Sequence, residues 1–313
     1  MSDWAPDMAR LEQFDDEEWL AVERHYAGRL FAYVARRVVD VAAREDVVQE
    51  SFLGAVRGIG SFDPSFTFEQ YLFGICRNRT IDHLRRRKAA RAVGEDEEDR
   101  PLLDGLVQDD ETPSSVVRSA DLRGKGRSLL VEILREWVQE TWEAEEFARL
   151  MVVEALLAGG WRNRDTWERF GLRDETAVAG IKFRALKRLR ELAARRDDSG
   201  ALLPALAEEA DQGRAQLDVG AIWRDARVSC PARHWLARHV AGTLDVGPCS
   251  FVDFHLKEME CPWCLANHDD LERSEEELDP LLERVRASTA RYLRSRSSGR
   301  PQCLGRDDPA GPG

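Results

Sequence analysis

The spacing of apolar residues constrains the fold of this chain more than any other feature of its sequence. Between residues 14 and 91 apolar side chains recur at steps of three and four, which places them on one face of a helix. The first such stripe consists of Trp19, Val22, Tyr26, Leu30, Val34 and Val38. Two further helices are expected from near Ala42 and near Thr67, separated by a loop that contains Gly58 and Gly60. The same period returns after residue 129, so the sequence predicts an all-α protein.

Composition divides the chain of 313 residues into segments. The stretch from Glu95 to Glu111 holds nine acidic residues and one Arg, and it has few apolar side chains with which to form a core. We therefore predict an acidic linker. The complete set of expected segments is a helical domain at 14–91, the linker at 92–128, a second helical domain at 129–196, a C-terminal extension at 217–296 and a disordered tail at 297–313.

The second helical domain has the outline of a helix-turn-helix. A short helix at about Arg164 to Phe170 is followed by Gly171, which readily adopts a left-handed conformation and so ends a helix. Asp174 can then cap a new, basic helix. This order of helix, glycine turn and basic helix is typical of DNA-binding helix-turn-helix motifs.

Two basic clusters bear on nucleic-acid binding. The net charge of −12 argues against such binding, yet seven Lys or Arg lie between Arg77 and Arg91 and seven more between Lys182 and Arg196. Each cluster closes a helix and can meet phosphate groups. The alternative is a solvated helix face whose cations favour the helix C-terminus.

The residues from Arg44 to Phe52, REDVVQESF, resemble the AEDxxQExF block of the extracytoplasmic-function branch of the sigma-70 family of bacterial RNA polymerase sigma factors. A second match follows at Phe68, Tyr71-Leu72, Ile75, Asn78, Asp82 and Arg85, where the family usually has Trp-Leu. The resemblance covers about half of the chain. It implies a protein without enzymatic activity that binds core RNA polymerase and promoter DNA.

The resemblance also implies roles for individual residues. The block with Asp46, Gln49, Glu50 and Phe52 would dock on the polymerase. In the loop, Phe62 and Phe66 are candidates to receive a flipped promoter base, with core packing as the alternative for each. Further candidate DNA-binding residues are Asn78, Arg85, Arg86, Arg87, Lys182, Arg184, Lys187 and Arg188. The acidic linker would suit a basic polymerase channel as a nucleic-acid mimic, or it is a solvated spacer.

The second domain departs from the family pattern at positions that matter for base recognition. Trp167 stands where the family has a small Ala, and Ala179, Gly180 and Ile181 follow Val178 where basic and Ser residues are usual. Specific base contacts need polar or bidentate side chains. We therefore expect this domain to bind DNA loosely or to serve another role.

The C-terminal extension contains a candidate metal site at Cys230, His255, Cys261 and Cys264. The Cys261-x-x-Cys264 pair, with one further Cys and one His, is a common tetrahedral zinc set and resembles the zinc-binding anti-sigma domains. The interval from His255 to Cys261 is longer than in those domains, and Cys249 is a substitute ligand. A Cys-x-x-Cys pair without metal is the alternative, while a redox pair is disfavoured because no βαβ pattern accompanies it.

The sequence is compatible with three functions. The first is a cytoplasmic sigma factor with a regulatory C-terminal module in cis, and we expect neither membrane insertion nor catalysis because no apolar leader, long apolar run or catalytic motif is present. The second is a helix-turn-helix regulator that acts without polymerase. The third is a regulatory factor that chiefly binds protein and has degraded promoter contacts.

Overall fold

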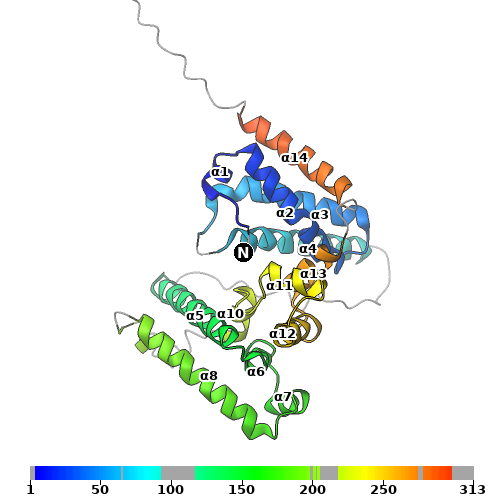
Figure 1. The fold of residues 1–313 in the computed structure, drawn as a ribbon. Helices are drawn as coiled ribbons and strands as arrows, with labels where there is room; N and C mark the ends of the chain where they lie inside the picture. Colours follow the sequence, from blue (N-terminus) through cyan, green and yellow to red (C-terminus); the bar gives the residue numbers. More distant parts are fainter. Residues whose placement is uncertain are drawn as a thin grey trace, which may run out of the picture. The chain divides into compact units, whose positions relative to one another are not determined.

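The fold is known from a computed structural model that describes residues 4–64, 66–92, 117–197, 200–201, 203–204, 218–273 and 278–297 (Figure 1). Within these ranges the regular elements are all helices, which confirms the all-α prediction. The chain forms two compact units. The first unit contains residues 4–100 and 273–313, and the second contains residues 101–272 with residues 1–3.

The first unit is a helical bundle, and two of its longer helices begin at acidic caps. The side chains of Asp15 and Asp40 accept hydrogen bonds from backbone N–H groups in the first turns of α2 and α3. Its core contains Trp19, Leu30, Phe52 and Leu72. The elements are α1 (Met8–Glu12), α2 (Asp16–Ala35), α3 (Val41–Gly58), η1 (Ile59–Ser61), α4 (Phe68–Ala92) and α14 (Asp279–Ser297).

The last helix of the chain belongs to this first unit. α14 packs against α2 and α3 and buries a stripe at steps of four residues, namely Leu281, Val285, Thr289 and Leu293 (Figure 1). The prediction of one C-terminal domain over 217–296 is therefore wrong, because the extension is divided between the two units. Amphipathic spacing showed which face of α14 is buried but not which helices cover it.

The second unit combines the predicted helix-turn-helix domain with the first part of the extension. Trp137, Leu150, Trp223 and Phe251 from both parts share one core. α5 begins within the segment we expected to be linker, since it starts at Val117. The helices are α5 (Val117–Glu143), α6 (Phe147–Leu157), α7 (Asn163–Arg169), α8 (Glu175–Arg196), α10 (Val219–Asp225), α11 (Arg233–Val240), α12 (Val246–Lys257) and α13 (Pro262–Glu272).

The turn between α7 and α8 has the predicted form. Gly171 has a φ of +60°, the left-handed conformation that glycine adopts without steric cost. Asp174 caps α8 by accepting a hydrogen bond from the Ala177 N–H at 2.8 Å. The acidic stretch 95–111 and the tail beyond residue 297 lie outside the described residues, so the predictions made for them stay predictions.

Candidate functional sites

The face of α3 that was predicted to dock on polymerase is open in part. Asp46 and Glu50 are exposed and Gln49 is half-buried, and their spacing of three and four residues places them together on the helix. Phe52 is fully buried in the core of the first unit. Phe52 therefore positions α3 from within, and its assignment as a polymerase contact is corrected.

A groove between α3 and α4 joins two groups of predicted residues. It is lined by Glu50, Leu53 and Arg57 of α3 and by Arg79, Asp82, Arg85 and Arg86 of α4. Glu50 was expected to meet polymerase, whereas Arg85 and Arg86 were expected to meet DNA. The fold thus brings residues of both predicted sites to the walls of one groove.

The two loop aromatics have different surroundings. Phe66 is exposed at 45% of its surface, which is uncommon for a large apolar side chain. Phe62 is half-buried and lies edge-on to Tyr71, with ring centroids 5.4 Å apart. The Tyr71 hydroxyl donates to the Ala55 carbonyl at 3.0 Å, which anchors this pair to α3. Of the two loop aromatics, Phe66 is therefore the more exposed, and Phe62 is held against Tyr71.

The basic cluster of α8 is partly used inside the second unit. Arg188 donates two hydrogen bonds to Glu140 of α5, at 2.5 and 2.9 Å. Arg195 and Arg196 pair with Glu136 and Glu132 of the same helix. These acidic partners were not recognised in the sequence, because their pairing depends on how α5 and α8 pack.

The remaining basic residues of α8 keep their charge available. Lys182 is half-buried, while Arg184, Lys187 and Arg190 are exposed, and within the described part of the chain none of the four forms an ion pair. Phe183 stands between the first two and is 63% exposed. α8 thus presents a smaller basic face than its sequence suggests, with one large aromatic in it.

The predicted metal ligands come together in the second unit. One potential ligand atom from each of Cys230, His255, Cys261 and Cys264 lies within 4.8 Å of the others. The Sγ atoms of Cys230 and Cys261 are 3.6 Å apart. Two thiolates at ~2.3 Å from a tetrahedral zinc ion lie about 3.8 Å apart, so the sulfur spacing fits such an ion. The longer interval before Cys261 is accommodated because α12 ends at Lys257 and Cys261 precedes α13.

The electrostatics of the cluster favour a thiolate at Cys261. Hydrogen bonds from Cys230 and Cys264 lower the pKa of the Cys261 thiol well below its usual value. The hydrogen bond with Cys261, together with burial, raises the pKa of Cys230 to about 11. The lowered pKa favours the thiolate form of Cys261, and thiolate sulfur is a donor suited to a soft or borderline cation.

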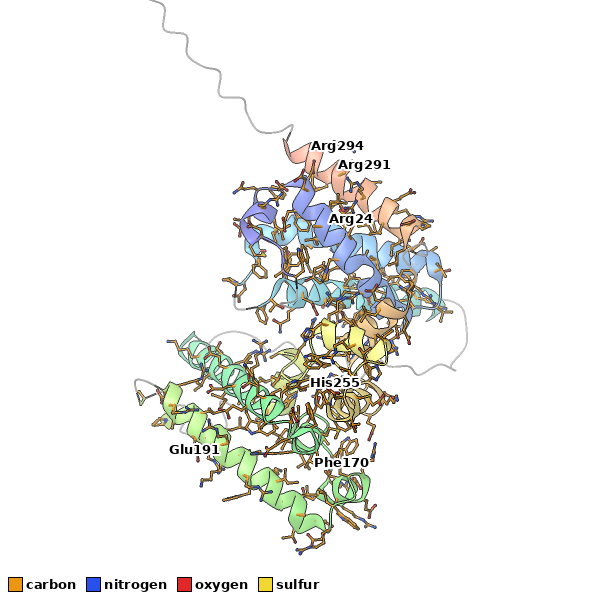
Figure 2. The ribbon with its side chains drawn as sticks, viewed as in Figure 1. Arg24, Phe170, Glu191, His255, Arg291 and Arg294 are labelled. Atoms are coloured by element: carbon orange, nitrogen blue, oxygen red, sulfur yellow. The ribbon has the colours of Figure 1, made fainter. Side chains whose placement is uncertain are left out.

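His255 is held by a residue that the sequence analysis missed. Its Nδ1 lies 2.8 Å from Oε1 of Glu154 on α6, and both side chains are buried. Glu154 is the only charged residue in the apolar run from Leu150 to Leu157, and this isolated charge was the available sequence signal. Among the residues that the structure describes, the buried Nε2 atom of His255 has no hydrogen-bond partner. The His255 side chain is labelled in Figure 2.

Comparison with known proteins assigns part of the first unit. Residues 23–90 match the family model of Sigma-70 region 2. The ECF RNA polymerase sigma factor SigW of Bacillus subtilis (strain 168) is 29% identical over 79 residues, which cover 25% of this chain and 42% of SigW. The RNA polymerase sigma factor CarQ of Myxococcus xanthus is 31% identical over 107 residues, 33% of this chain and 61% of CarQ.

These matches are partial. The chain spans about two fifths of SigW and three fifths of CarQ. No solved structure matches the chain significantly. Among the described helices, none is long and apolar enough to cross a lipid bilayer.

Proposed function

We propose that this protein is a sigma factor of the extracytoplasmic-function type. In this role it binds core RNA polymerase in the cytoplasm, directs it to promoter DNA and assists strand opening, without chemistry of its own. The observation that supports the proposal most strongly is the Sigma-70 region 2 match over residues 23–90. Both relatives are sigma factors by name, and the exposed Asp46 and Glu50 lie on the matched segment.

The groove between α3 and α4 supports this proposal. A sigma factor has to engage polymerase and the opened DNA strand through neighbouring surfaces. Here Glu50 stands on the same groove as Arg85 and Arg86, and Phe66 is exposed in the preceding loop. Exposed arginines attract phosphate groups, and an exposed aromatic ring can stack on an unpaired base.

Association with core polymerase tests the proposal. The Gln49→Ala/Glu50→Ala double variant of the full chain should bind purified core polymerase at least tenfold more weakly than the wild type. Glu17→Ala is the matched control, since Glu17 is 90% exposed and lies on α2, outside the predicted docking face. Run-off transcription with the reconstituted polymerase supplies the functional readout. Unchanged binding by the double variant contradicts the docking assignment.

We further propose that Cys230, His255, Cys261 and Cys264 hold one zinc ion. The close sulfur spacing and the unpartnered Nε2 of His255 support this ligand set. Zinc would supply a structural cross-link between the loop after α10, α12 and the start of α13. Metal analysis of reduced protein that has not met chelator should give one zinc per chain. Retention of full zinc content by Cys264→Ser would contradict the assignment.

A second candidate function is protein binding through α8. It is favoured by the exposed Phe183, because an exposed aromatic side chain flanked by cations is common at protein interfaces. Two results together would identify this role. The protein would bind polymerase without supporting promoter-specific transcription, and Phe183→Ala would abolish its association with a partner protein.

A further inference from the structure

A chain of buried hydrogen bonds links the proposed zinc ligand His255 to the helix-turn-helix part of the second unit. Oε1 of Glu154 accepts from the Ser229 hydroxyl at 2.7 Å and lies 2.8 Å from His255 Nδ1. The Ser229 hydroxyl oxygen in turn accepts from the Trp223 indole N–H at 2.8 Å. Glu154 lies on α6, whereas its partners lie on or after α10 and on α12.

The charge on Glu154 demands an explanation, because the side chain is only 1% exposed and sits in an apolar helix. Burial of an unpaired carboxylate costs several kcal/mol. Among the described residues, His255 is its ion-pair partner, and Oε2 accepts no hydrogen bond. In this structure the charge of the buried Glu154 carboxylate is balanced by His255.

The Glu154 carboxylate fixes the tautomer and the direction of the His255 imidazole. An ionised carboxylate only accepts hydrogen bonds, so Nδ1 of His255 has to carry the proton that it shares with Glu154. The lone pair of a neutral imidazole is then on Nε2, the atom that is buried without a partner. Metal-binding histidines commonly donate their second N–H to a carboxylate in this way.

We propose that Glu154 is the positioning residue of the metal centre and that metal loading couples residues 219–272 to α6. This inference rests on the proposed zinc site. α6 contributes Leu150 and Val153 to the main core of the second unit and Val152 and Leu156 to the core around Val178 of α8. A metal ion held through His255 and Glu154 therefore stabilises the packing of α6 against α8.

A second hydrogen bond connects the segment after α10 to the helix-turn-helix part of the unit. The guanidinium of Arg135 on α5 donates to the Ala226 carbonyl at 2.9 Å, directly after α10. The segment that carries Ser229 and Cys230 is thus held between α5 and α6. Loss of metal should loosen this segment at both contacts, whereas α1–α4 belong to the other unit.

The test compares zinc affinity and local stability in full-length Glu154→Gln. The amide oxygen can still accept from Ser229 and His255, so the change removes charge while preserving shape. Glu146→Gln is the matched control, because Glu146 is exposed at the start of the same helix. Competition with a chromophoric chelator, using zinc alone as the probe, should show a 10–100-fold loss of affinity for Glu154→Gln only.

Hydrogen exchange supplies the second readout. Zinc removal from the wild type should accelerate exchange in α6 and α12 and leave α2–α4 unchanged. Circular dichroism confirms that each variant is folded. The inference is overturned if Glu154→Gln binds zinc as tightly as the wild type does. It is also overturned if the wild type binds no zinc, or if hydrogen exchange in α6 of the wild type is the same with and without zinc. None of these readouts involves polymerase, so failure here is distinguishable from failure of the sigma-factor proposal.

Discussion

Glu154 and Glu23 are acidic residues whose burial could not be seen in the apolar pattern of the sequence. Glu154 faces His255, and Glu23 on α2 is 3% exposed where α14 covers it. Burial raises the pKa of Glu23 from its ordinary 4.5 to about 7, while a hydrogen bond with Thr289 and the charge of Arg286, both on α14, act in the opposite direction and Asp16 adds a small further rise. The folded first unit therefore prefers Glu23 protonated.

The raised pKa of Glu23 predicts a pH-dependent stability. Between pH 4.5 and 7 the folded state holds a proton that the unfolded state has lost, so stability is complete below pH 4.5 and falls as the pH rises to about 7. A shift of this size corresponds to about 3 kcal/mol. Glu23→Gln should remove this dependence and stabilise the unit at pH 8 by about 2 kcal/mol.

Thermal unfolding followed by circular dichroism at pH 5.5 and pH 8 measures this effect. Glu17→Gln is the control, since Glu17 is 90% exposed on the same helix. Equal pH dependence in the wild type and Glu23→Gln would show that Glu23 does not titrate in this range.

At the residue scale, the sequence predicted the roles of residues whose contacts lie within a few positions along the chain. Asp174 caps α8 as expected, and Phe68 and Leu72 of the second family match are core residues. Phe52 and Glu154 were not understood from sequence. The family motif contains Phe52 without separating contact residues from supporting ones, and the partner of Glu154 lies about one hundred residues away.

At the scale of elements, the buried faces of helices followed from periodicity, whereas the helices that cover those faces did not. Each amphipathic stripe specifies the face that must be buried, but any complementary apolar surface satisfies it. This is why α14 was expected within a C-terminal domain, although it packs on α2 and α3. The acidic residues of α5 likewise gave no sign that they would pair with α8.

The ion pairs of α8 predict that the adjacent residues Lys187 and Arg188 contribute differently to DNA binding. Lys187 is exposed and has no ion-pair partner among the described residues, while Arg188 is held by Glu140 and Glu191. In holoenzyme titrations of a promoter duplex, Lys187→Ala should reduce the slope of log affinity against log salt by about 0.9. Arg188→Ala should leave that slope unchanged and cost about 1 kcal/mol of stability or less.

This comparison also tests the DNA-binding proposal for α8. Arg173→Ala is a useful control, because Arg173 is exposed before the helix and already pairs with Asp174. Equal slopes for Lys187→Ala and the wild type would remove Lys187 from the DNA-binding surface.

The docking of α14 predicts a sharp difference between two substitutions on one helix. Val285 is fully buried, so Val285→Asp places a charge in the core and should cost about 3 kcal/mol or more. Ala287 is exposed, and Ala287→Asp adds the same charge without that cost. Hydrogen exchange should show loss of protection in α14 for Val285→Asp alone. Wild-type protection in that variant would contradict the packing of α14 on α2 and α3.

At the scale of the whole molecule, the net charge of −12 is an unreliable guide to binding. Acidic residues of α5 neutralise Arg188, Arg195 and Arg196 within the second unit. The cations left on α8 and around the groove of the first unit form two smaller basic surfaces. The isolated protein should therefore bind duplex DNA weakly and with strong salt dependence.

The path of the chain between its two units makes a further prediction. The first unit is built from residues 4–100 and 273–313, so two connections join it to the second unit. A specific protease site inserted between residues 93 and 116 would, after cleavage, leave fragments that still associate through α14. Size-exclusion chromatography should show one species for the cleaved wild type and two for cleaved Val285→Asp. Separation of the cleaved wild-type fragments would contradict a stable α14 contact.

Because the first unit is built from two segments of the chain, its folding during translation has to wait for the second segment. α2 and α3 are synthesised early, but the helix that covers their shared apolar face follows the whole second unit in the sequence. During elongation that face has to remain uncovered or be shielded by a chaperone while the whole second unit is made. The first unit is therefore completed only after the second unit has been synthesised, and chains truncated before α14 lack the helix that closes it.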